Sequence, residues 1–301
     1  MSKLLLNKIN STQKMKEIFT RINPILFDVS LRDGIQNAPV SEYPIEKKIE
    51  IFEKIIYSEN PLKIEIGSIA SHRFLPIMKD TIPLYKHVVE NRLVNNTDVY
   101  VLVPSITKLN FAIYNNIYNY SFITSTSNAF QLKNTCRTIE KTKADFAEMF
   151  ERIDRVAKNT RKKLYVSCID HCPIIGQIPR DKIIEELLYY NTHYQFDEIC
   201  LSDTCGNLSF ENFAYIVDNV TLLGMNVDRL SLHLHISPDN IDNSIKILKY
   251  CFENELNKFD VSLLETGGCS VTMKSDQLLP NLSYELFYKI LYEYIVEEME
   301  K

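Results

Sequence analysis

The chain has 301 residues, 45% of them hydrophobic, so it can bury a substantial core and is too long to be a small module stapled by disulfides. Its 34 basic and 39 acidic residues leave a net charge of −5, which excludes the electrostatic footprint of a protein that binds nucleic acid or an anionic membrane. The seven cysteines lack CxxC spacing, which argues against a disulfide framework or a zinc knuckle and favours a reducing compartment.

Residues 1–23 are basic, with five lysines or arginines against a single glutamate. This pattern weakly resembles an organelle presequence, but a helix that caps the bottom of the fold explains it as well, and we favour the helix. No run reaches the 18 apolar residues of a membrane span. We therefore expect a cytoplasmic protein, with an organelle matrix as the alternative, without nucleic-acid or membrane partners. A homodimer is compatible with the sequence.

Short runs rich in β-branched and aromatic residues then recur at a regular pace along the chain. They predict strands at 25–29, 62–66, 99–103, 120–124, 164–168, 198–202, 230–236 and 260–264. The segments between them have helical spacing of apolar residues, most clearly at 45–57 and 183–194. Pro44, Asp181 and Ser209 stand where helices should begin.

Eight strands that alternate with helices in about 300 residues match the α/β fold of the (β/α)8 TIM barrel. An open, doubly wound sheet is the second choice. We expect a single catalytic domain over 1–301, with barrel strands from about 25 to 264. A closing lid loop and a last helix would occupy 265–301.

Polar residues gather where the expected strands end. The carboxyl ends of the strands and the loops after them build the active site of a barrel. We expect the substrate-binding residues to be Gln36, Glu65, Ser68, Asp203 and Thr204. Two of these, Glu65 and Asp203, fit equally well a role in orienting metal ligands or in a structural polar network.

His233 and His235 are separated by one residue on a predicted strand, so both side chains should point into the barrel. Two buried, hydrogen-bonded histidines would give the same pattern. Asp33, at the mouth of the same barrel, favours the metal interpretation because it completes a mixed set of nitrogen and oxygen ligands suited to Mg²⁺ or Mn²⁺.

Arg32 and Cys269 complete the set of candidate catalytic residues. A guanidinium beside a metal ion would stabilise negative charge that develops on a carbonyl oxygen, although Arg32 fits a salt bridge at the barrel mouth too. Cys269 follows two glycines on the expected lid loop, where its thiol would transfer a proton. The alternative for Cys269 is a small apolar filler.

Taken together, these segments resemble the DRE-TIM metallolyases, the branch of barrel enzymes that contains 3-hydroxy-3-methylglutaryl-CoA lyase. The resemblance runs from about residue 25 to 287. It is carried by the segments 32–37, 65–68, 165–168 with 172–173, 202–204, 233–235 and 267–269. The chain departs from the family's pattern after His235 and in the cysteine loop, which is longer and poorer in glycine.

The resemblance implies a role for each candidate. Asp33, His233 and His235 would bind a divalent metal ion, and Asn281 would complete the site. His233 would also serve as the base that removes the proton of the substrate hydroxyl. Arg32 would polarise the thioester carbonyl, and Cys269 would protonate the departing carbanion.

The reaction implied is the cleavage of a 3-hydroxyacyl-CoA, such as 3-hydroxy-3-methylglutaryl-CoA, into acetyl-CoA and acetoacetate. A related aldolase, or a synthase that condenses acetyl-CoA with a 2-oxo acid, is the second hypothesis. A barrel that binds metal without catalysis is the third.

Overall fold

The computed structural model describes residues 2–9, 11–91, 93–94, 96–156, 159–269 and 271–301. Within them, eight parallel strands close into a barrel in the order β1-β10-β9-β8-β5-β4-β3-β2. These strands are β1 (Ile25–Asp28), β2 (Lys63–Ser68), β3 (Asp98–Leu102), β4 (Tyr120–Ser125), β5 (Lys162–Ser167), β8 (Glu198–Asp203), β9 (Leu230–Leu234) and β10 (Lys258–Val261). The TIM-barrel prediction is confirmed, and the open sheet is excluded because β1 pairs with β10.

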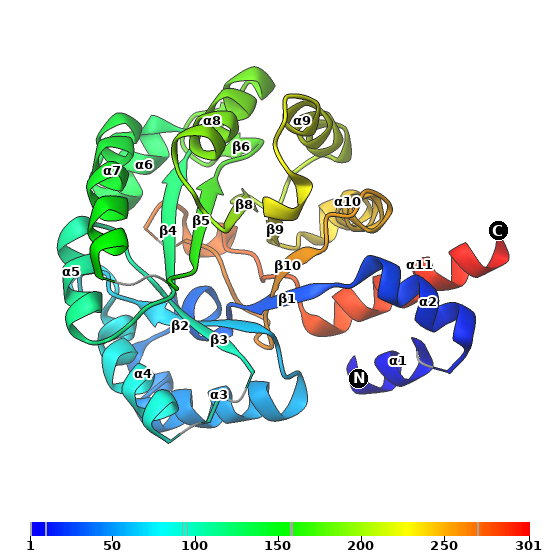
Figure 1. The fold of residues 1–301 in the computed structure, drawn as a ribbon, viewed down its shortest axis with the longest axis horizontal. Coiled ribbons are helices and arrows are strands. Elements are labelled where there is room, and N and C mark those ends of the chain that lie inside the picture. Colours follow the sequence, from blue (N-terminus) through cyan, green and yellow to red (C-terminus); the bar gives the residue numbers. More distant parts are fainter. Residues whose placement is uncertain (1, 10, 92, 95, 157–158, 270) are drawn as a thin grey trace.

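Helices cover the outside of the barrel (Figure 1). They are α3 (Ile45–Ser58), α4 (Thr81–Glu90), α5 (Ile106–Tyr114), α6 (Asn128–Thr135), α7 (Ile139–Val156), α8 (Arg180–His193), α9 (Phe210–Leu222), α10 (Ile241–Glu253) and α11 (Tyr284–Glu300). Several begin at a serine whose hydroxyl accepts a backbone N–H of the first turn, as Ser209 does for Asn212. The start expected at Asp181 is wrong, because α8 begins one residue earlier, after Pro179.

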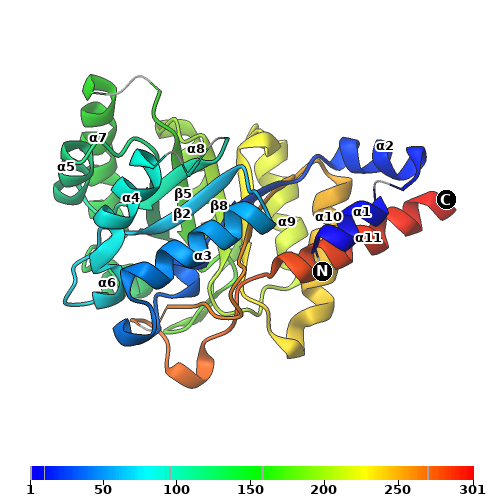
Figure 2. The same cartoon turned by 90° about the horizontal axis from the view of Figure 1, so that it is seen from below.

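The N-terminal segment forms two helices, α1 (Ser2–Ile9) and α2 (Gln13–Ile22). The prediction of helix is confirmed, but the expected position across the bottom of the barrel is wrong. Both helices pack against α11, and Figures 1 and 2 place all three together at one side of the barrel. The buried side chains of Ile9, Met15 and Ile18 explain this position, because α11 offers them an apolar face. No helix among the described residues is long and apolar enough to span a bilayer.

The last strand ends earlier than its sequence predicts. Residues 260–264 are expected to be extended, but β10 ends at Val261. The hydroxyl of Ser262 binds the backbone N–H and C=O of Leu264, at 3.0 and 2.9 Å, and so turns the chain out of the barrel. The segment after β10 crosses the mouth of the barrel before α11 begins.

A short antiparallel hairpin follows β5. It consists of β6 (His171–Cys172) and β7 (Gly176–Gln177).

Candidate metal centre

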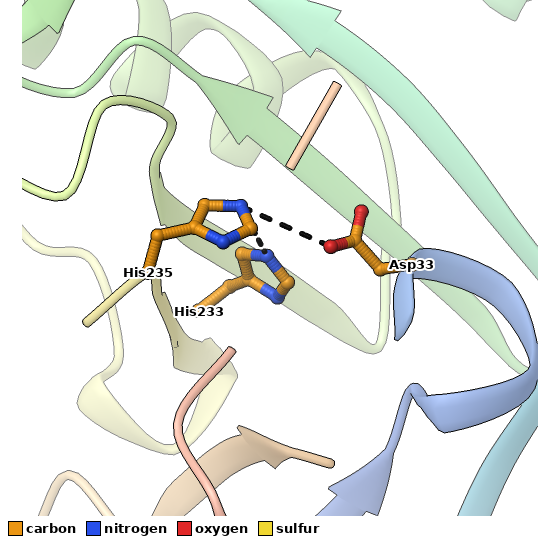
Figure 3. A group of neighbouring side chains, drawn as sticks. All are labelled: Asp33, His233 and His235. Carbon is orange, nitrogen blue, oxygen red and sulfur yellow. Dashed lines mark hydrogen bonds and ion pairs between the residues drawn. The ribbon is translucent and has the colours of Figure 1, made fainter. Parts of the chain in front are cut away.

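Three ligating side chains converge inside the carboxyl end of the barrel. His233 lies on β9, His235 follows that strand, and Asp33 lies in a π-helical turn, Ser30–Gly34, directly after β1. One ligand atom from each lies within 4.8 Å of the other two, and all three residues are buried. Figure 3 shows the two rings turned toward one another, with the Asp33 carboxylate facing them. The predicted ligand set is therefore brought together in space.

Hydrogen bonds determine which nitrogen of each imidazole faces this point. His233 Nδ1 lies 3.1 Å from Asp260 Oδ2, and His235 Nδ1 lies 3.2 Å from the carbonyl oxygen of Leu279. Both partners accept hydrogen bonds, so both Nδ1 atoms carry the proton and both Nε2 atoms present lone pairs. Those Nε2 atoms are 3.4 Å apart, and His235 Nε2 is 3.9 Å from Asp33 Oδ2. Lone pairs directed at one point in this way suit a cation.

Charge and burial prepare the same residues for a metal ion. Burial acts to raise the pKa of Asp33, but Arg32 and the two imidazoles outweigh it and hold that pKa below its usual range. Burial lowers the pKa of His235 to about 4, despite the nearby Asp33 carboxylate. At neutral pH the site therefore presents a carboxylate and a neutral imidazole, the protonation states that metal binding requires.

Asn281 provides a further test of the fit. It lies opposite His235 in an isolated β-bridge, and its amide nitrogen donates to the carbonyl of Thr266 at 3.0 Å. Its Oδ1 is buried and accepts no hydrogen bond from the described residues. A buried amide oxygen without a partner is costly, and a divalent ion is one partner that would satisfy it. The residues present thus fit a metal ion held by nitrogen and oxygen.

Arg32 connects the centre to a buried ion-pair network. Its guanidinium binds the carboxylates of Asp33 and Glu65, and it lies 4.8 Å from the centre of the Tyr165 ring. Tyr165 donates to Glu65 Oε2 at 3.1 Å. Arg32 also lines the same cavity as Asp33, His233 and His235. Its ion pairs therefore leave it accessible to a ligand in that cavity.

The glycine loop closes over the same point. The backbone N–H of Gly268 donates to Asp33 Oδ2 at 3.2 Å, and Asn37 Nδ2 donates to the carbonyl of Gly267 at 2.9 Å. Gly268 has φ +86°, a conformation that glycine adopts readily. Cys269 follows and lines the cavity, with its Sγ 3.5 Å from Asn134 Oδ1. Burial raises the pKa of this thiol, which therefore keeps its proton at neutral pH.

Comparisons with known proteins bear on this arrangement. No protein-family model and no curated protein sequence matches the chain. Solved structures do match. The hydroxymethylglutaryl-CoA lyase of Acinetobacter baumannii, in complex with coenzyme A and 3-methylmalate, aligns with TM-score 0.76 and 21% identity over 91% of this chain and 90% of that chain. The chain has the fold of these lyases.

Two further lyases of the same name align equally broadly. That of Bacillus subtilis has TM-score 0.74 and 20% identity over 92% of this chain and 94% of its own. The lyase of Pseudomonas aeruginosa has TM-score 0.72 and 20% identity over 91% of this chain and 90% of its own chain. The resemblance seen in the sequence is thereby confirmed at the level of the fold.

Within this lyase fold, most of the predicted residues meet at one cavity. Those that line it are Arg32, Asp33, Gln36, Ser68, Thr204, His233, His235 and Cys269. Glu65 is fully buried and holds Arg32. Asp203 accepts hydrogen bonds from the backbone of Asn207 and Leu208, at 3.3 and 3.2 Å, and burial raises its pKa to about 6. In this structure Asp203 therefore shapes its own loop.

Sequence reasoning overlooked three residues at this site. Asp260 orients His233, Asn134 contacts Cys269, and Tyr165 was noticed only as part of a family-like segment. Asp260 and Tyr165 lie on barrel strands, where every second residue faces the interior. A charged or hydroxyl-bearing residue at such a position needs a buried partner, and this signal could have identified both.

Proposed function

We propose that the protein is a divalent-metal-dependent carbon–carbon lyase of the DRE-TIM type, which cleaves a 3-hydroxyacyl-CoA such as 3-hydroxy-3-methylglutaryl-CoA into acetyl-CoA and acetoacetate. The observation that carries the proposal is the convergence of Asp33, His233 and His235 on one point. Asn281, paired with His235 in a β-bridge, adds a buried Oδ1 that has no hydrogen-bond partner among the described residues. The likeness to a lyase solved with coenzyme A supports a thioester substrate.

Asp33, His233, His235 and Asn281 would hold the ion, with Mg²⁺ or Mn²⁺ suited to this mixed donor set. A bound divalent ion lowers the pKa of a coordinated hydroxyl and polarises a coordinated carbonyl. His233 accepts the hydroxyl proton through Nε2, its only free lone pair. Because that lone pair serves one partner at a time, His233 would use it either to hold the ion or to accept the proton.

Arg32 stabilises the negative charge that bond cleavage creates, and Cys269 protonates the carbanion. When the bond between C2 and C3 breaks, negative charge moves onto the thioester oxygen, and the fixed guanidinium of Arg32 stabilises it without losing a proton. The carbanion then takes its proton from Cys269, and the proton that His233 removed from the hydroxyl restores the thiol, so no net proton is consumed. Burial supports this last role, because the raised pKa keeps the thiol protonated until the carbanion forms.

The cavity wall suits a short acyl group. Its lining includes apolar side chains, those of Leu75, Leu102, Pro104, Ile123 and Phe130. The lining also carries hydroxyl groups, including those of Ser68, Ser167 and Thr204. Such a mixed lining suits both the methyl branch of a hydroxyacyl chain and its oxygen atoms.

The decisive assay offers the purified protein 3-hydroxy-3-methylglutaryl-CoA with Mn²⁺ or Mg²⁺. We expect acetyl-CoA and acetoacetate in equal amounts, and none after chelation of the metal. Cys269→Ala should bind Mn²⁺ normally yet turn over roughly 100-fold or more slowly, the usual scale for loss of a proton-transfer group. Cys136→Ala, which removes an exposed thiol, is the matched control and should keep the wild-type rate.

Other outcomes would point to the alternatives. Consumption of acetyl-CoA with a 2-oxo acid, without cleavage of any hydroxyacyl thioester, would replace the lyase by a synthase. A protein that binds Mn²⁺ tightly and processes neither class of substrate would be a binding protein.

A further inference from the structure

A row of buried charged residues lies beneath the candidate metal centre, and the proposed chemistry does not use it. Asp260 of β10 binds His233 Nδ1 at 3.1 Å through Oδ2, and its Oδ1 binds the ammonium of Lys163 on β5. Lys163 Nζ also lies 2.7 Å from Glu198 Oε1, and Glu198 Oε2 lies 2.7 Å from Lys63 Nζ. The side chains of Lys163 and Asp260 are each 1% exposed.

The charges in this row balance, two ammonium groups against two carboxylates. Burial acts to lower the pKa of Lys163, but Asp260 and Glu198 outweigh it and raise that pKa above its usual range. The ammonium also lies 3.9 Å from the centre of the Phe27 ring, which favours a cation. The ammonium of Lys163 therefore gives the Asp260 carboxylate a counter-charge inside the barrel.

The Asp260 carboxylate dictates which ring nitrogen of His233 carries the proton. A carboxylate can only accept a hydrogen bond, so His233 must carry its proton on Nδ1 and present the Nε2 lone pair to the metal site. The carbonyl of Leu279 imposes the same tautomer on His235. For His233, however, the hydrogen-bond acceptor is a side chain, Asp260, which is itself paired with the ammonium of Lys163.

We propose that Asp260, paired with Lys163, is a positioning residue that selects the metal-binding tautomer and orientation of His233. This rests on the proposed metal site. It adds that the ion pair between Asp260 and Lys163, and not the ligands alone, determines metal affinity. Partners that orient ligating histidines elsewhere contribute about 10–100-fold to metal affinity.

Asp260→Asn is the critical variant, because its shape is unchanged. The ammonium of Lys163 will draw the amide oxygen to itself, which turns the amide NH2 toward His233. Nδ1 must then accept a hydrogen bond, and the ring proton moves to Nε2, the atom that should bind the metal. We expect the Mn²⁺ dissociation constant, measured by calorimetry or electron paramagnetic resonance, to rise about 10–100-fold.

Glu198→Gln is the matched control. It removes the other carboxylate partner of Lys163 and should cost similar stability, but it leaves the contact between Asp260 and His233 intact. Its Mn²⁺ affinity should equal that of the wild type. A folded Asp260→Asn protein with wild-type affinity, or an equal loss of affinity in Glu198→Gln, would overturn the proposal.

A second measurement needs no variant. In the metal-free wild-type protein at pH 7.5, ¹⁵N chemical shifts of the imidazoles should report His233 protonated on Nδ1. A proton on Nε2 would overturn the role of Asp260 even if Asp260→Asn failed to fold. If the wild type bound no Mn²⁺ at all, the proposed function would fall, while this tautomer measurement would still decide whether Asp260 controls His233.

Discussion

Arg32 is both a buried ion-pair partner and part of the cavity lining. Its guanidinium neutralises Asp33 and Glu65, both buried, and one face of it remains on the cavity wall. The salt bridge and the stabilisation of oxyanion charge were alternatives in the sequence, but the structure makes them compatible. A substitution of Arg32 therefore changes the folded state as well as the chemistry.

We expect Arg32→Met to lower turnover by about 100-fold or more, because a group that meets developing oxygen charge is lost. The same change leaves two buried carboxylates without a counter-charge, so the free energy of unfolding should fall by about 3–5 kcal/mol. Turnover at saturating Mn²⁺ and the urea midpoint measure the two effects separately.

The double variant Arg32→Met with Glu65→Gln serves as the control. It removes one charge of each sign and should recover part of the lost stability, but none of the lost turnover. Recovery of both together would mean that Arg32 is only a structural ion-pair partner.

At the scale of elements, the segment between β10 and α11 closes the metal centre. It brings Asn281 opposite His235, ties Gly268 to Asp33, and places Cys269 on the cavity wall. Gly267 packs so closely on Asn281 that a Cβ atom there would lie 2.6 Å from Asn281 Nδ2. The glycine therefore permits the position of the asparagine.

This contact predicts the effect of Gly267→Ala. The added methyl group must displace the Asn281 side chain, whose amide oxygen is a proposed ligand, so Mn²⁺ affinity should fall roughly tenfold or more. Gly176→Ala is the control. Its φ is +78°, and among the described residues no atom beyond its own chain neighbours lies within 4 Å of the new Cβ. Calorimetric titration of both variants makes the comparison. Unchanged affinity in Gly267→Ala would remove Asn281 from the ligand set.

At the scale of the whole molecule, the candidate metal centre joins parts of the chain that lie 200 residues apart. Asp33 follows the first strand of the barrel, His233 lies near the end of β9, and His235 directly follows that strand. An ion that binds all three stabilises the closed barrel relative to the unfolded chain, in which no such site exists.

We therefore expect Mn²⁺ to raise the thermal unfolding midpoint. At 100 times its dissociation constant the ion should add about 2.7 kcal/mol, a shift of several degrees. In the double variant His233→Ala with His235→Ala the shift should vanish while the barrel still folds, because strand ends at the mouth contribute little to the core. Differential scanning calorimetry with and without EDTA tests this. A wild-type response in the double variant would refute the metal assignment.

The sequence by itself determined the barrel, and it predicted eight of the residues that line the cavity. The alternation of strands and helices depends on local hydrophobic periodicity, which each segment carries within itself. The period of two along β9 likewise placed His233 and His235 on one face before any tertiary contact was known. The predicted ends of elements were less accurate. β10 ends at Val261 because the side chain of Ser262 binds the backbone of Leu264, and a hydrophobic pattern does not encode this hydrogen bond.

Only the tertiary structure decided which polar residues serve one another. Asp260 meets His233 because β10 pairs with β9 in a register that sets Phe259 opposite Leu232, and register depends on the packing of the whole barrel. Asn281 faces His235 only once the segment after β10 folds across the mouth. The position of α1 and α2 on α11, instead of under the barrel, was decided in the same way. Such pairings join residues that lie far apart in the chain. They form only when the barrel closes, so no local pattern in the sequence encodes them.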